Sequence, residues 1–112
     1  MAAESFLYLT TTGRVSGLPR TIEIWFVERA GRYYVVAERR EDAQWVKNLE
    51  RDPAVRFRVG TRDDPGRDAT ATARVVREPE LVAAVASLMD AKYGWSDGLV
   101  IEIAPRLEAR PP

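Results

Sequence analysis

Short strand-like segments and tight turns dominate this sequence, and only two segments have the length and periodicity of helices. Six segments are rich in β-branched, aromatic or alternating apolar residues, which indicates strands. They are Ser5–Thr11, Arg20–Glu28, Arg32–Glu38, Val55–Val59, Ala69–Val76 and Leu99–Ile103. Apolar residues recur at helical spacing in Glu41–Arg51 and Pro79–Tyr93. Two helices cannot cover both faces of six strands. We therefore predict a small closed or nearly closed barrel that buries one face of its sheet internally.

The links between the strand segments favour antiparallel pairing. Ala30-Gly31 has the length of a hairpin turn, and Gly13–Pro19 is a glycine-bounded loop between the first two strands. Residues 63–66, Asp-Asp-Pro-Gly, form a strong turn signal. The predicted fold class is α+β, mainly antiparallel, with six strands and two helices. The outer sheet face needs the helices or a second copy of the chain, so we also predict a homodimer.

The length of 112 residues is typical of one domain. We predict a single domain over residues 1–112, with a core of about 5–105 and a frayed tail at 106–112. No apolar run approaches the ~20 residues that a membrane span needs. The first residues also lack the basic and apolar regions of a secretory leader. We therefore predict a cytoplasmic protein without a membrane span.

Two residue types are missing from the sequence, and their absence restricts the possible chemistry. There is no His and no Cys. This excludes Ser-His-Asp and Cys-His nucleophiles, the usual zinc sites and the common haem ligands. We predict no metal site, and the sequence identifies no catalytic residue. The 17 basic and 17 acidic residues balance, which argues against nucleic acid as a partner. An enzyme of this composition would rely on carboxylates, Tyr or Lys, or on a bound organic cofactor.

The first candidate site is the loop that joins the first two strands. Three threonines precede Gly13, and Arg14, Ser16 and Arg20 follow within a few residues. Backbone N–H groups of a glycine turn can bind an anion, and arginine offers paired donors to a phosphate. The alternative is a solvated hairpin loop with ordinary surface arginines. The spacing is not that of a P-loop.

Further candidates follow the third strand and lie on the first helix. Arg39 and Arg40 come at a strand end, where a barrel mouth would open, and Asp42 could cap the helix. We interpret Arg40 as part of a salt-bridged loop. Asn48 lies one helical turn from Trp45 and could bind a ligand or cap a neighbouring backbone group.

Aromatic residues offer flat surfaces on which a planar ligand could stack. Trp25, Tyr33, Tyr34, Trp45, Tyr93 and Trp95 are the candidates. Most aromatic residues of a small barrel belong to its core, and we assign Trp45 to the core. The segment Tyr93–Trp95 follows the second helix and is the better candidate for a pocket rim.

The loop and the first helix together resemble a known family, the deazaflavin-dependent nitroreductases. The segments that carry the resemblance are Leu9–Arg20 (LTTTGRVSGLPR), Trp45–Leu49 (WVKNL), Asp52–Val55 (DPAV), Ala73–Val76 and Val100–Pro105. The resemblance extends over roughly residues 6–105. It implies a split β-barrel of the pyridoxamine-phosphate-oxidase type, a superfamily whose members bind the deazaflavin coenzyme F-420, FMN or haem.

The resemblance also implies a function and a set of binding residues. The reduced cofactor would pass a hydride to a nitroaromatic, a quinone or another conjugated small-molecule acceptor. Arg14, Ser16 and Arg20 would hold the phosphate or the acidic tail of F-420. Trp25 would lie beside the cofactor, Arg39 would take the place of a basic residue at the end of the third strand, and Asn48 would lie near the site from the helix. Two departures from the family pattern are Val15, where many members carry Lys, and Glu23, where Pro is common.

Two alternatives to this function stay open from the sequence. The first is a reductase or oxidase that uses FMN in place of F-420. The second is a non-catalytic carrier of a flavin or a tetrapyrrole, because the same fold supports both catalysis and storage. Proton delivery would come from solvent or from Tyr93.

Overall fold

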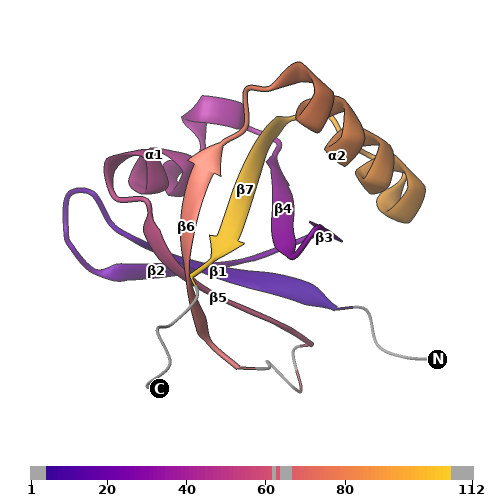
Figure 1. Cartoon of the computed structure of the whole chain (residues 1–112). Helices are drawn as coiled ribbons and strands as arrows, with labels where there is room; N and C mark the ends of the chain where they lie inside the picture. Colours follow the sequence, from indigo (N-terminus) through magenta and orange to yellow (C-terminus); the bar gives the residue numbers. More distant parts are fainter. Residues whose placement is uncertain (1–4, 62, 64–66, 107–112) are drawn as a thin grey trace, which may run out of the picture.

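Antiparallel pairing of neighbouring strands produces one curled sheet in the order β2-β1-β5-β6-β7-β4-β3 (Figure 1). The computed structural model describes residues 5–61, 63 and 67–106. Its strands are β1 (Phe6–Thr12), β2 (Pro19–Ile24), β3 (Val27–Arg29), β4 (Arg32–Ala37), β5 (Ala54–Gly60), β6 (Ala69–Val75) and β7 (Leu99–Pro105). Its helices are the 3-10 helix η1 (Arg40–Asp42) and the α-helices α1 (Gln44–Arg51) and α2 (Pro79–Tyr93). The predicted antiparallel α+β class is confirmed.

The segment predicted as a single strand over 20–28 is two strands, so the described residues form seven strands and not six. β2 pairs with β1, and β3 pairs with β4. These two strands are the opposite edges of the sheet, so the two residues between them, Trp25 and Phe26, carry the chain from one edge to the other. At this crossing the backbone N–H and carbonyl of Phe26 form hydrogen bonds with side chains of α2, where a residue within the sheet would bond to a neighbouring strand. This covalent link closes the curled sheet into a half-barrel.

The interior of the half-barrel is apolar, as the alternation predicts. Inward residues of β1, β4, β5, β6 and β7 form one buried cluster. Ile22, Ile24 and Phe26 contribute from the segment that crosses between the two edges. Helix α1 closes one end of the barrel, because Val46 and Leu49 are fully buried in the same cluster. The predicted apolar face of this helix is confirmed.

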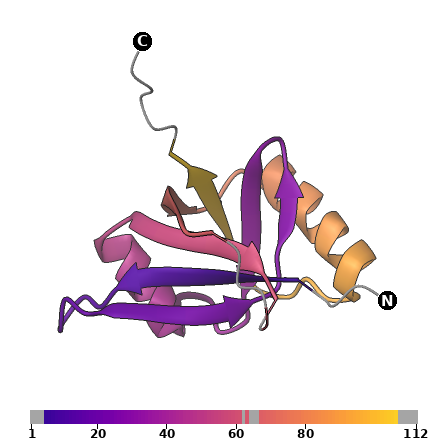
Figure 2. The same ribbon diagram turned by 90° about the horizontal axis from the view of Figure 1, so that it is seen from below.

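The outer sheet face is apolar where α2 covers it. Tyr34, Val36 and Val100 pack there against Val85 and Met89 of the helix. Figure 2 shows α2 lying along the β3–β4 hairpin, away from the hairpin of β1 and β2. On the remaining outer face the described strands present mainly threonine, arginine and glutamate side chains, among them Thr10, Thr21, Arg56, Arg74 and Glu102. Beyond α2, the outer face formed by the described strands is therefore mainly polar, and the homodimer stays a prediction.

Several helix boundaries and turns follow the sequence, whereas the start of the first helix does not. Helix α2 has Pro79 in its first turn and ends at Gly94, whose φ of 70° is the left-handed cap expected of glycine. Ala30 and Gly31 both have positive φ, as a tight hairpin of this kind requires. The predicted helix over 41–51 begins only at Gln44.

Asp42 does not cap the first helix, so that prediction is wrong. The residue before Gln44 is Ala43, and no side chain bonds to the exposed N–H groups of the first turn. The cause is the preceding turn, in which Arg40 has a φ of 54° and Asp42 belongs to η1. The predicted turn at 63–66 and the predicted tail at 106–112 lie almost entirely outside the described residues.

Among the described residues, neither α1 nor α2 combines the length and the apolar character that a transmembrane segment needs.

A buried carboxylate connects three strands on the polar part of the outer face. Glu102 is 3% exposed and accepts hydrogen bonds from the Tyr34 hydroxyl at 3.0 Å and from Arg74 Nε at 3.0 Å. Arg32 Nη1 lies 3.4 Å away. Burial raises the pKa of Glu102, but the hydrogen bonds from Arg74 and Tyr34 and the charges of both arginines outweigh it, so the pKa is lowered overall.

The lowered pKa of Glu102 makes its contribution to stability pH-dependent. The carboxylate stabilises the fold fully above about pH 4.5, and this stabilisation is lost as the pH falls through the lowered pKa. Glu102→Gln should lower the free energy of unfolding at pH 7 by about 1–3 kcal/mol, because a charged hydrogen-bond acceptor is lost from a buried position. Urea unfolding of both proteins from pH 7 to pH 3 measures this. The difference between them should shrink below pH 4.5, and a difference that stays constant to pH 3 would contradict the assignment.

Candidate functional site

Two adjoining cavities lie along β2 and the start of α1. The larger has a volume of about 850 Å³ and the smaller about 550 Å³. Gln44 and Trp45, in the first turn of α1, line both cavities. The two cavities therefore form one groove with two compartments, which we call the small and the large compartment.

The loop between β1 and β2 walls the small compartment and is held by its own backbone. The Gly13 N–H donates to the Leu18 carbonyl at 2.8 Å, and the Gly17 N–H donates to the Gly13 carbonyl at 2.8 Å. The Leu18 N–H donates to Ser16 Oγ at 3.2 Å. A Cβ atom at position 13 would lie 2.7 Å from Ser16 Oγ. Glycine at this position therefore allows the Ser16 hydroxyl to fold back over the turn.

Asn48 fixes the loop to helix α1. Its side chain is 5% exposed, and its Oδ1 accepts hydrogen bonds from the Arg14 backbone N–H at 3.2 Å and from Arg14 Nη1 at 3.0 Å. Its Nδ2 donates to the buried Thr11 hydroxyl at 3.3 Å. Gln44 Oε1 accepts a further hydrogen bond from Arg14 Nη2 at 2.7 Å. The amide of Asn48 thus binds a backbone group, one of the two roles that the sequence left open, and it also orients the Arg14 guanidinium, which the sequence did not predict.

The small compartment is positively charged. Arg14 and Arg20 line it together with Ser16, and its lining includes no carboxylate. Within the part of the chain that the structure describes, neither arginine forms an ion pair. Arg14 is held by neutral amide oxygens, so its charge stays uncompensated. Two such guanidinium groups and a hydroxyl fit a phosphate or a carboxylate-rich group.

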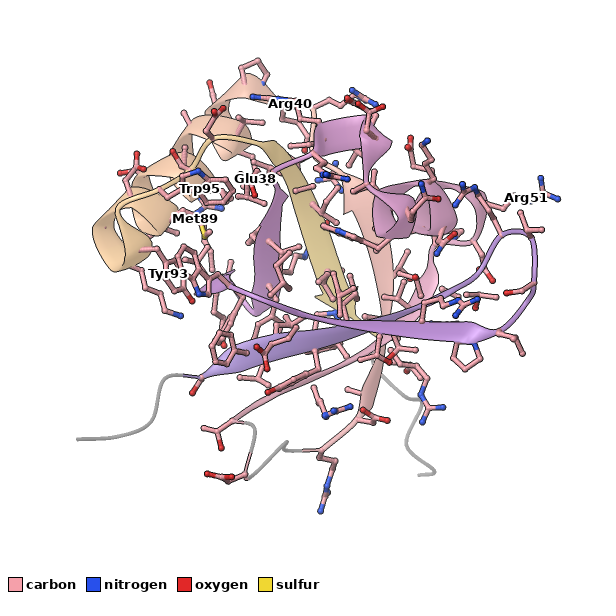
Figure 3. All side chains as sticks on the ribbon, turned by 180° about the vertical axis from the view of Figure 1, so that it is seen from behind. Glu38, Arg40, Arg51, Met89, Tyr93 and Trp95 are labelled. Carbon is pink, nitrogen blue, oxygen red and sulfur yellow. The ribbon has the colours of Figure 1, made fainter. Side chains whose placement is uncertain are left out.

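The large compartment has aromatic walls. All three tryptophans of the chain, Trp25, Trp45 and Trp95, line it. Trp25 stacks on Tyr93 with ring centroids 4.5 Å apart and an interplanar angle of 1°, and it meets Trp95 edge-on at 6.5 Å. In Figure 3, Met89 and Trp95 lie side by side near Glu38, and these three residues line the same cavity. Walls of this kind suit a flat, conjugated ligand.

The end of α2 fixes the crossing segment that carries Trp25. The Tyr93 hydroxyl accepts a hydrogen bond from the Phe26 N–H at 3.1 Å and donates to the Phe26 carbonyl at 2.9 Å. Lys92 Nζ donates to the same carbonyl at 2.8 Å. Because the backbone occupies the hydroxyl of Tyr93, and its ring lies behind Trp25, this structure does not support Tyr93 as a proton donor.

The two arginines that follow β4 differ in their surroundings. Arg39 lines the large compartment and has no ion pair among the described residues. Arg40 pairs with Asp97 at 2.9 Å on the surface, in agreement with its interpretation as a salt-bridged loop residue. Arg39 thus lies in the same groove as Arg14 and Arg20 but in the other compartment. The six predicted site residues, Arg14, Ser16, Arg20, Trp25, Arg39 and Asn48, all lie along this groove.

The acidic residues and the methionine that line the large compartment were missed by the sequence reasoning as site residues. They are Glu23, Glu38, Asp42 and Met89. The sequence shows acidic residues near strand ends, but it does not show which of them face a cavity. That information depends on where β4, η1 and α2 meet.

The family comparison covers most of the chain. Residues 1–95 match the model of the F-420H(2)-dependent quinone reductase family. The predicted resemblance to deazaflavin-dependent reductases is confirmed, and the matching family is named for quinone as the acceptor.

Solved structures with similar folds agree with the predicted split barrel. The heme storage protein HutZ from Vibrio cholerae aligns with a TM-score of 0.74 at 21% identity, over 92% of this chain and 82% of that chain. An F-420-H2 dependent reductase, FDR-A, aligns with a TM-score of 0.69 at 23% identity, over 88% and 92%. A candidate pyridoxamine 5′-phosphate oxidase from Listeria innocua aligns at 0.71 and 16% identity, over 91% and 84%. These neighbours confirm the split barrel of the pyridoxamine-phosphate-oxidase type.

The anchoring role of Asn48 can be tested by proteolysis, without any ligand. In Asn48→Ala the loop loses the two hydrogen bonds that Arg14 donates to Asn48 Oδ1. Trypsin should therefore cleave after Arg14 several-fold faster than in the parent protein. The unfolding free energy should fall by about 1–3 kcal/mol, because the buried Thr11 hydroxyl also loses its partner. Gln44→Ala is the matched control, since it removes only the exposed hydrogen bond to Arg14 Nη2. Equal cleavage rates at Arg14 in all three proteins would refute the anchoring role.

Proposed function

Because this chain belongs to the F-420H(2)-dependent quinone reductase family, we propose that it transfers a hydride from reduced F-420 to a conjugated small-molecule acceptor. The observation that carries the proposal is the division of the groove. A positively charged compartment with two uncompensated arginines adjoins an aromatic compartment with three tryptophans. F-420 combines an acidic tail with a flat ring, so its two parts match the two compartments in chemistry. The acceptor is a quinone, a nitroaromatic or a related conjugated compound.

The residues of the groove would bind and position the cofactor. Arg14 and Arg20 would neutralise its phosphate or acidic tail, and Ser16 would add a hydroxyl donor. Trp25 would provide an aromatic wall for the ring, and Arg39 a positive charge beside it. When bound, reduced F-420 supplies the hydride. The protein contributes position and electrostatics, which agrees with a sequence that has no His and no Cys. The proton that completes the reduction would come from water, because the Tyr93 hydroxyl is bonded to backbone.

The fold alone leaves FMN chemistry and ligand storage as alternatives, and HutZ makes storage the more specific of the two. The chain has none of the His or Cys residues that commonly ligate haem iron. A carrier function would therefore concern a flavin more readily than haem.

Purified protein titrated in turn with F-420, FMN and haem tests the cofactor by absorbance and fluorescence. We expect F-420 to bind and its reduced form to be oxidised when menadione or a nitroaromatic is added. Binding of FMN and not of F-420 would indicate a reductase or oxidase that uses FMN. Binding without oxidation of the reduced cofactor would favour a carrier, and binding of none of the three would refute both functions.

The Arg14→Ala/Arg20→Ala variant tests the position of the acidic part of F-420. Each lost charged hydrogen bond should cost about 1.5–3 kcal/mol, and each 1.4 kcal/mol raises the Kd about tenfold. We expect the Kd for F-420 to rise at least 100-fold in a protein whose circular dichroism and unfolding midpoint are close to those of the parent. Arg51→Ala is the control, since Arg51 is an exposed arginine of α1 that lines neither compartment (Figure 3). An unchanged Kd in the double variant would refute the assignment.

We further propose that the chain acts as a homodimer in the cytoplasm. Exposed apolar side chains on the loop between β1 and β2 and at the large compartment support the dimer: Val15 is 93% exposed, Leu18 57% and Trp25 38%. Light scattering of the purified protein should give about twice the chain mass of 12.6 kDa. A value near one chain mass at micromolar concentration would refute the dimer and leave the cofactor assignment unaffected.

A further inference from the structure

Charges of opposite sign line the two compartments of the groove. The small compartment has Arg14 and Arg20 and no carboxylate. The large compartment has Glu23, Glu38 and Asp42 in its lining against a single guanidinium, that of Arg39. The groove is therefore basic at one end and acidic at the other.

The acidic end is where an acceptor would enter. If the acidic tail of the cofactor binds at Arg14 and Arg20, its ring would lie toward Gln44 and Trp45, the residues shared by both compartments. The acceptor must reach that ring, and the remaining volume lies in the large compartment, about 850 Å³ in all. An acceptor would thus lie among the tryptophans and close to the carboxylates.

Two of these carboxylates have no partner among the described residues that would compensate their charge toward an entering ligand. Glu38 follows β4 and Asp42 lies in η1, and both are exposed. Within the described residues neither forms an ion pair or a side-chain hydrogen bond. Glu23 differs, because its carboxylate accepts a hydrogen bond from the Tyr8 hydroxyl at 2.9 Å. Charges at a surface a few ångström from a ligand change its affinity by roughly tenfold in total, and salt screens this effect.

We propose that the large compartment selects uncharged or cationic acceptors and rejects anionic ones, with Glu38 and Asp42 as the specificity-determining residues. This inference rests on the proposed function, because it places the acceptor beside a cofactor whose tail occupies the basic compartment. The substrate class is then a neutral quinone without a carboxylate or sulfonate substituent. A bound anionic cofactor adds to the repulsion of anions and does not cancel it.

The test compares two acceptors that differ by one charge. Menadione with a 3-propionamide side chain and menadione with a 3-propionate side chain share the same ring and nearly the same shape. Binding is measured by quenching of the tryptophan fluorescence, which reports on this compartment because Trp25 and Trp95 line it alone and Trp45 lies where it adjoins the small compartment. Free N-acetyltryptophanamide corrects for collisional quenching. Turnover is measured as oxidation of reduced F-420.

We expect the propionate to bind roughly tenfold more weakly than the amide at 20 mM salt, with a kcat/KM lower by the same factor. In 1 M NaCl, where the screening length is about 3 Å, the ratio should approach one. In Glu38→Gln/Asp42→Asn the affinity for the propionate, relative to the affinity for the amide, should rise several-fold at low salt. The lining of the compartment then holds one carboxylate, Glu23, and one guanidinium, Arg39. The matched control is Glu41→Gln/Glu50→Gln, which removes two exposed carboxylates that line neither compartment. Its ratio should equal that of the parent protein.

The outcomes separate this inference from the proposed function. Equal binding of the two acceptors at low salt, or a ratio that both double variants change alike, would overturn the charge selection even if reduced F-420 is oxidised. A tenfold, salt-sensitive binding ratio without oxidation of reduced F-420 would support the charge selection and refute the proposed reductase function.

Discussion

The short crossing at Trp25 and Phe26 is the constraint on which the rest of the structure depends. It joins β2 and β3, which are the two edges of the sheet. Two peptide units with no strand partner would be costly beside a core, because their N–H and C=O groups need hydrogen bonds. The Tyr93 hydroxyl and Lys92 Nζ supply those bonds to Phe26. As a result the two edges of the half-barrel stay joined, Phe26 enters its core, and Trp25 lines the large compartment.

The same crossing explains why the ligand site and the second helix belong together. Helix α2 covers the outer face of β4 and β7 through Val85 and Met89. Its last turn fixes the crossing, and the residues after it bring Trp95 to the cavity wall. Gly98 allows the segment after Trp95 to pass close to the end of β4, because a Cβ atom at position 98 would lie 2.5 Å from the Ala37 carbonyl oxygen. The fold thus assembles the aromatic compartment from segments far apart in the sequence.

Local patterns predicted the elements of this protein well where one physical rule decided the outcome. The alternation of Ile22, Ile24 and Phe26 identified the inward face correctly, although the segment is two strands. The periodic Val46 and Leu49 identified the face of α1 that closes the barrel. The single strand over 20–28 was wrong because alternation does not report which partner a strand pairs with. The cap at Asp42 failed because the preceding turn with Arg40 at positive φ delays the helix to Gln44.

The sequence by itself determined the chemistry that this protein can use. The absence of His and Cys excluded nucleophilic triads and common metal sites, and the Leu9–Arg20 and Trp45–Leu49 motifs indicated the family. Only the tertiary structure decided which of those residues contact one another and which face the same cavity. It directed Asn48 to Arg14 and grouped Glu38 and Asp42 opposite the basic compartment. The physical reason is that residue type and spacing determine local conformation and charge. Which charges face the same cavity depends on contacts between segments that are distant in the chain.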